Sequence, residues 1–105
     1  MGLKSYTGRI YSEGERKYSY PFRVYSLPAR DSLQGRLIIS VPKKLFKRAV
    51  KRNLIRRRIK EAYRRNCGDY PDLRDKDLLI VYVSNRILDY EDISRFLAET
   101  MEKVR

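Results

Sequence analysis

The sequence contains no histidine, and it has a single cysteine among its 105 residues. Without histidine there is no His-ligated metal site, no His-based catalytic triad, and none of the acid–base pairs that usually work near neutral pH. The one cysteine, Cys67, has no partner for an internal disulfide and fits a reducing compartment. We therefore expect a cytoplasmic protein without a disulfide framework.

Long apolar runs and a secretory signal are also missing. The longest uninterrupted apolar run, from Leu78 to Val83, is far shorter than the roughly 20 residues that span a bilayer. No N-terminal stretch joins a basic segment to an apolar one. Apolar residues nevertheless make up 42% of the chain, enough for a compact core. We expect residues 1–105 to form one domain that does not enter a membrane.

Acidic residues are scarce in one part of the chain. The formal net charge is +12, and residues 43–65 alone contribute +11 of it, with Glu61 as their only acid. Self-repulsion of this size destabilises a fold unless an anionic partner relieves it. A solvated charged face is the usual explanation of a charge run, but the missing local acids favour a nucleic-acid partner here.

The pattern of apolar and turn-forming residues predicts an α+β fold, with helices packed on one small mixed sheet of about four strands. The predicted order is α-β-β-β-α-β-α. The elements are a short helix over 4–13, two strands within 15–27 interrupted near Pro21, a strand over 36–41, a helix over 47–66, a central strand over 78–83 and a helix that Asp89 caps.

On a helical wheel, residues 47–66 separate into two faces. Ile55, Ile59 and Ala62 fall together and are expected to bury against the sheet. Asn53, Arg57, Lys60 and Arg64 form a stripe on the far side, flanked by Arg56, and we expect no acids of the fold to neutralise it. Such cations suit successive phosphates, and the Asn53 amide suits a base edge or a 2′-hydroxyl. Arg52 falls nearer the apolar side, where it either extends its stem over apolar surface or lines a groove.

The segment Ala49-Val50-Lys51-Arg52-Asn53-Leu54-Ile55-Arg56-Arg57-Arg58-Ile59-Lys60-Glu61-Ala62-Tyr63-Arg64 closely resembles the signature helix of the bacterial ribonuclease P protein subunits. As in that family, a strand and a Lys-Lys pair, here Lys43-Lys44, precede the helix. The likeness extends over most of the chain. Two positions depart from the family pattern: Leu54 replaces an arginine, and Thr7 replaces an aromatic residue.

The resemblance implies a fold like that of the second domain of ribosomal protein S5. It also implies an endoribonuclease holoenzyme in which a catalytic RNA removes the 5′ leader of precursor tRNA by hydrolysis. Magnesium ions, mainly held by the RNA, would act there, with no organic cofactor and no obligatory protein partner. No residue of this chain would be catalytic. The implied contacts with the catalytic RNA are Lys51, Arg52, Asn53, Arg56, Arg57, Lys60 and Arg64.

By the same resemblance, Tyr11 and Tyr25 would line a cleft that receives the single-stranded leader, because bases of any sequence stack on aromatic rings. The alternative for Tyr25 is a core residue whose hydroxyl reaches the surface. Tyr18, Tyr20 and Phe22 are expected to pack within the sheet.

Three other functions stay open: a non-catalytic module that binds structured RNA or the ribosome, a protein-only nuclease, and a DNA-binding regulator. A nuclease needs acidic metal ligands. Residues 66–77 contain four candidates, and we interpret them as a solvated loop: Asp69, Asp72, Asp75 and Asp77.

Overall fold

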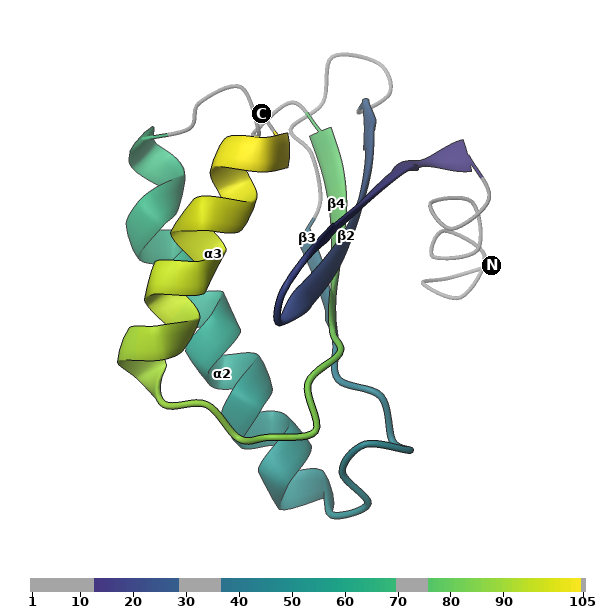
Figure 1. Cartoon of the computed structure of the whole chain (residues 1–105), viewed down its shortest axis with the longest axis vertical. Helices are drawn as coiled ribbons and strands as arrows, with labels where there is room; N and C mark the ends of the chain where they lie inside the picture. The colour runs from purple at the N-terminus through teal and green to yellow at the C-terminus, as the bar shows by residue number, and fades with distance from the viewer. Residues whose placement is uncertain (1–12, 29–36, 70–75, 105) are drawn as a thin grey trace.

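The computed structural model describes residues 13–28, 37–69 and 76–104, and its strands form one four-stranded sheet. The strands are β1 (Glu15–Ser19), β2 (Phe22–Pro28), β3 (Leu37–Ser40) and β4 (Lys76–Tyr82), and their order across the sheet is β1-β2-β4-β3. Two helices, α2 (Ala49–Asn66) and α3 (Tyr90–Val104), lie together on one face of the sheet (Figure 1). The predicted α+β class is confirmed, and the helix predicted over residues 4–13 lies outside the described residues except for its last one.

The central position of β4 explains its apolar sequence. It pairs antiparallel with β2 and parallel with β3, so both of its edges are hydrogen-bonded, and its side chains are buried on both faces of the sheet. Parallel neighbours need a crossover connection, and α2 lies in the connection between β3 and β4. Helix α2 packs on the sheet through its middle turns, where Ile55, Ile59 and Ala62 are buried, and its N-terminal end extends beyond the strands (Figure 1).

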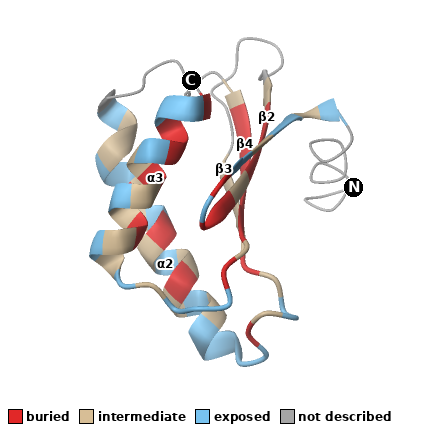
Figure 2. Ribbon diagram, viewed as in Figure 1, coloured by how far each residue is buried: buried red, intermediate tan, exposed pale blue. Residues whose placement is uncertain are grey.

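Side-chain alternation along the strands gives the sheet two different faces. Phe22, Val24, Ile80 and Tyr82 form the main core with the apolar residues of α2 and α3. Figure 2 shows buried positions on the strands and on the sides of the helices that face them. The other face has a second, smaller cluster made by Tyr25, Leu79 and Val81, with Ile38 and Val83 packed against it.

Two element boundaries differ from the prediction. Helix α2 begins at Ala49 because Arg48 has an extended backbone, with φ −80° and ψ 126°. Strand β4 begins at Lys76, since Lys76 and Asp77 pair with Pro28 and Leu27 of β2. Asp77 is thus 4% exposed within a strand, and its assignment to a solvated loop was wrong.

Polar contacts hold both ends of α3. At its start, the Asp89 carboxylate accepts a hydrogen bond from the backbone N–H of Asp92 at 2.8 Å, which confirms the predicted cap. At its end, Lys17 and Lys76 donate to the carbonyls of Lys103 and Val104, which would otherwise lack partners in the helix.

We expect Asp89→Ala to lower the free energy of unfolding by about 1 kcal/mol, because α3 loses its cap. Asp89→Asn keeps an acceptor at the same place and is the matched control. Urea denaturation followed by circular dichroism measures both variants. Equal loss in the two variants would show that the charge, and not the hydrogen bond, stabilises the start of α3.

Candidate nucleic-acid interface

Burial of one side of α2 determines which of its side chains face solvent. Ile55, Ile59 and Ala62 are completely buried between α2, the sheet and α3, as the wheel predicted. Asn53, Arg57 and Lys60 lie on the opposite side of the helix and are exposed. The apolar seam therefore turns the predicted stripe outward.

Two arginines of α2 are used within the fold. The Arg52 guanidinium donates from Nη1 to the carbonyls of Phe46 and Lys47, both at 2.8 Å. The Arg58 guanidinium donates from Nη1 to the carbonyl of Leu88 at 2.6 Å. Arg52 thereby anchors the segment before α2 to the helix, and Arg58 anchors the connection between β4 and α3 to α2. These cations satisfy backbone acceptors as well as adding positive charge.

Glu61 neutralises the far end of the helix. Its carboxylate accepts hydrogen bonds from Arg64 at 2.7 and 3.1 Å and from Arg65 at 3.1 Å. These bonds hold the pKa of Glu61 below its usual value, and the bond to Glu61 raises the pKa of Arg64. The expectation of an unneutralised stripe therefore does not hold at Arg64, because side chains three or four residues apart meet on one helix face.

Arg56 and Asn53 contact each other. Arg56 donates from Nη1 to Oδ1 of Asn53 at 2.7 Å, which fixes the orientation of the amide. The Asn53 side chain is exposed, and its amide nitrogen has no acceptor among the described residues. Its donor group can therefore bond a base edge or a 2′-hydroxyl while Arg56 holds it in place.

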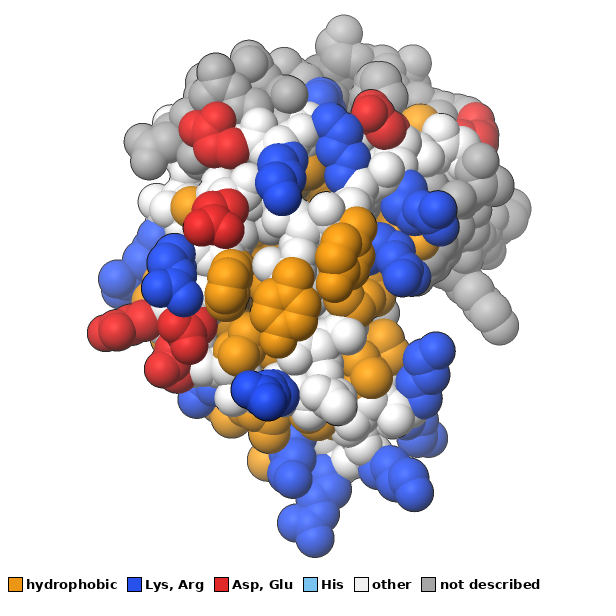
Figure 3. Space-filling view, viewed as in Figure 1, with side chains coloured by type: hydrophobic (Ala, Val, Ile, Leu, Met, Phe, Trp, Pro, Cys, Tyr) orange, Lys and Arg blue, Asp and Glu red, His pale blue; other side chains and the backbone are white. Residues whose placement is uncertain are grey.

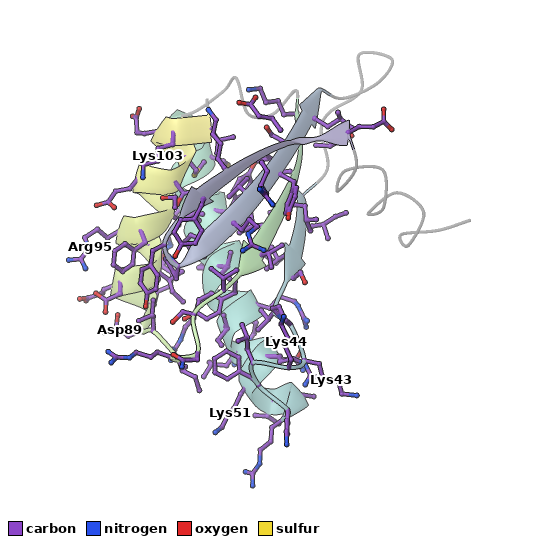
Figure 4. All side chains as sticks on the ribbon, turned by 45° about the vertical axis from the view of Figure 1, so that its right-hand side comes forward. Lys43, Lys44, Lys51, Asp89, Arg95 and Lys103 are labelled. Atoms are coloured by element: carbon purple, nitrogen blue, oxygen red, sulfur yellow. The ribbon has the colours of Figure 1, made fainter. Side chains whose placement is uncertain are left out.

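The cations whose side chains have no acceptor among the described residues lie in the first two-thirds of α2 and in the segment before it. Three are on the helix, and no side-chain hydrogen bond or ion pair joins them to the described part of the chain: Lys51, Arg57 and Lys60. The same is true of four exposed cations in the segment before it: Lys43, Lys44, Lys47 and Arg48. Figure 3 shows Lys and Arg side chains crowded at this end of the molecule, and Figure 4 shows Lys43, Lys44 and Lys51 pointing outward there.

The helix itself adds to this positive end. Its first turn has no acidic residue, and Arg48 at the N-cap makes no side-chain capping bond. The partial positive charge of the N-terminal N–H groups therefore adds to the field of the neighbouring lysines. The four cations of the segment before α2 belong to the charged run of residues 43–65, but they were not among the predicted RNA contacts. Their positive charge was the sequence signal that could have identified them.

A shallow groove runs along the exposed side of α2. Val50, Asn53, Arg56, Arg57 and Lys60 line this open space of about 570 Å³. Its walls combine long aliphatic stems with charged ends, a surface that suits a phosphate–sugar backbone. The structure thus brings four of the five predicted residues of the stripe and its flank into one shallow groove, and the fifth, Arg64, does not line it.

Of the two tyrosines predicted to line a leader-binding cleft, the structure describes only one. Tyr11 lies outside the described residues. Tyr25 is on the face of the sheet away from the helices, but it is only 7% exposed and packs with Leu79 and Val81. Tyr18 was expected to pack within the sheet, and that prediction was wrong, because its side chain is 60% exposed.

The acidic residues offered as metal-ligand candidates do not form a site in what is described. Among residues 13–28, 37–69 and 76–104 there is no group of three Asp, Glu, Cys or His side chains placed to hold a metal ion. Asp72 and Asp75 lie outside those residues. Neither described helix is long and apolar enough to span a bilayer.

Comparison with known proteins places this geometry in a family. The family model described as Ribonuclease P matches residues 5–105. The "Ribonuclease P protein component" of Porphyromonas gingivalis is 28% identical over 109 residues, covering 97% of this chain and 80% of the relative.

Solved structures agree in fold. The RNase P protein of Staphylococcus aureus, at 2.0 Å, has a TM-score of 0.71 and 28% identity, covering 99% of this chain and 92% of that one. The RNase P protein of Thermotoga maritima, in complex with 1-(4-fluorophenyl)-2-thiourea, has a TM-score of 0.84 and 22% identity, covering 100% and 99%.

Some cations of α2 bond to acceptors within the fold and others face solvent, and this difference predicts different effects of two alanine substitutions. Arg52→Ala removes two charge-assisted hydrogen bonds and leaves two carbonyls without their donor, so we expect a loss of about 2 kcal/mol in unfolding free energy. Arg57→Ala removes a solvated cation and should stay within about 0.5 kcal/mol of the parent protein. Chemical denaturation of both variants is the measurement. An equal loss of unfolding free energy in the two variants would contradict the view that Arg52 supports the fold and Arg57 does not.

Proposed function

The chain belongs to the ribonuclease P protein family, and from this premise we propose that it is the protein subunit of a ribonuclease P holoenzyme. In this proposal it binds the catalytic RNA and the 5′ leader of precursor tRNA, and it assists the magnesium-dependent cleavage that produces the mature 5′ end. The observation that supports it best is the group of cations along the first two-thirds of α2 and in the segment before it that no acid of the described fold neutralises.

The proposed surface for the catalytic RNA is the groove along α2 together with the positive end before it. Arg57 and Lys60 contact phosphates, and Lys51 extends the same row toward Lys43 and Lys44. Asn53, oriented by Arg56, contacts a 2′-hydroxyl or a base edge, which distinguishes RNA from a uniform polyanion. Arg52 acts from beneath this surface, since it holds the segment that bears the lysines.

The chemistry in this proposal belongs to magnesium ions bound mainly by the RNA. The protein supplies positive potential and shape, so that RNA helices and substrate approach each other at lower magnesium concentration. Counterion release makes such binding steeply salt-dependent. No organic cofactor and no additional protein partner are needed, and a cytoplasmic location follows from this role.

Reconstitution tests the proposal directly. The protein is added to a bacterial ribonuclease P RNA and a precursor tRNA at low magnesium. We expect faster cleavage at the mature 5′ end and none by the protein alone. Cleavage by the protein alone in magnesium would instead indicate a protein-only nuclease. Tight binding of structured RNA without faster cleavage would favour the non-catalytic RNA-binding module.

The double variant Arg57→Ala/Lys60→Ala tests the surface. Losing two phosphate contacts should make the plot of log affinity for the catalytic RNA against log salt shallower by about 2, with little change in affinity for an isolated leader oligonucleotide. Filter binding between low and moderate salt measures this slope. The matched control is Arg95→Ala/Lys103→Ala, which removes the same charge from the exposed side of α3 (Figure 4).

An equal change of slope in both double variants would mean that overall charge, and not position on α2, determines binding.

A further inference from the structure

The hairpin of β1 and β2 presents side chains on the sheet face away from the helices. In the register of the two strands, Tyr18 lies opposite Arg23, and Arg16 lies opposite Tyr25. Tyr25 belongs to the cluster on that face, so Arg16, Tyr18 and Arg23 share its side of the sheet. One face of the hairpin therefore carries two neighbouring cross-strand pairs, each made of one tyrosine and one arginine.

The intervening residues of β1 point the other way. Lys17 donates to the carbonyl of Lys103 at 2.7 Å, and Thr100 donates to the hydroxyl of Ser19 at 3.0 Å, which attaches their side of β1 to α3. These two contacts hold β1 against the helix layer. They therefore also determine that Tyr18 faces outward.

Tyr18 offers the most exposed aromatic ring in the described part of the chain. Its side chain is 60% exposed, against 7% for Tyr25. Tyr20 is 44% exposed, but its ring packs edge-on against Phe96 at 5.7 Å and its hydroxyl bonds Ser84 at 3.1 Å. An unpaired ring on a rigid strand suits stacking, because little conformational freedom remains to be lost on binding.

The surroundings of Tyr18 on this face are positive. Arg16 is exposed and Arg23 is half-buried, and neither has an acidic partner among the described residues. Beyond Arg23 lies a hollow of about 400 Å³, which Lys44 borders and the side chains of Val81 and Val83 help to line. No acidic residue lines this hollow. The path from Tyr18 past Arg23 therefore leads toward the cations that precede α2.

We propose that Tyr18 is a stacking platform for a base of single-stranded RNA whose phosphates lie along Arg23 and Lys44. The proposal rests on the proposed function, since the strand it would receive is the leader of precursor tRNA. It places the principal aromatic contact on β1, at the position diagonal to the buried Tyr25 in the register of the two strands. Cationic side chains beside an open ring match the two features of a single strand, a charged backbone and exposed bases.

The test uses the reconstituted holoenzyme and three substrates. One is a precursor tRNA with a long unpaired leader, the second has the leader cut to its last nucleotide, and the third has abasic sites placed singly along the long leader. We expect Tyr18→Ala to weaken binding of the first by about five- to tenfold and to leave the second unchanged. Tyr18→Phe keeps the ring and should bind like the parent.

Abasic substitution locates the contact. At one leader position, removing the base should lower the affinity of the parent holoenzyme for precursor tRNA by about as much as Tyr18→Ala does. Combining that abasic site with Tyr18→Ala should lower the affinity no further. Arg23→Gln should make the salt dependence of leader binding shallower by about 0.7, the value for one phosphate contact in a single strand. Ile87→Ala removes another exposed apolar side chain and should change neither quantity.

The possible failures are distinguishable. If the parent holoenzyme binds long and short leaders equally, the leader-binding part of the proposed function fails and this inference fails with it. In the other case the parent prefers the long leader, and Tyr18→Ala, whose unchanged melting temperature shows that it is folded, keeps the same preference. That result would overturn the stacking platform on β1 and leave the subunit assignment standing.

Discussion

Repulsion among like charges on α2 is the constraint on which the rest of this structure depends. The helix places eight cations and one acid in eighteen residues, while Ile55, Ile59 and Ala62 must stay against the sheet. Five of the cations have hydrogen-bond acceptors within the described fold. Three keep their charge unpaired, and they continue into the four cations of the preceding segment. The remaining potential is therefore concentrated at one end of the molecule (Figure 3).

The internal contacts of the arginines connect stability to binding. Arg52 and Arg58 donate to carbonyls in the segments before α2 and α3, so the same residue type that gives the helix its charge also anchors the connections around it. A guanidinium suits this double use because it has five donors in one plane, whereas a lysine ammonium acts as a point charge. Lysines accordingly predominate in the segment before α2, where the side chains only project into solvent.

The two faces of the sheet have different roles because α2 and α3 cover only one of them. On the covered face, apolar side chains from the helices and strands form the core, and Ser19 and Thr100 form a hydrogen bond across it. On the other face, the ring of Tyr25 lies among Leu79 and Val81, while Tyr18 stays open beside two arginines. The contacts proposed for a single strand and for a folded RNA therefore lie on separate surfaces, and Lys44 belongs to both.

The sequence by itself determined the element order and the two faces of α2, because helical and strand periodicities are local and the apolar seam follows directly from them. It also located the charge, since a run of cations is visible without coordinates. Only the tertiary structure decided which cations stay free and which aromatic ring stays open. Arg52 and Arg58 find acceptors in other segments, and the backbone of Arg48 delays the helix. Pairing with β2 buries Asp77, and the hairpin register turns Tyr18 outward. The bond of Arg58 to Leu88 and the pairing that buries Asp77 join segments distant in sequence, and no local pattern specifies such contacts. The bonds of Arg52 reach only five and six residues back, but they depend on the conformation of the segment before α2, which the helical pattern does not specify.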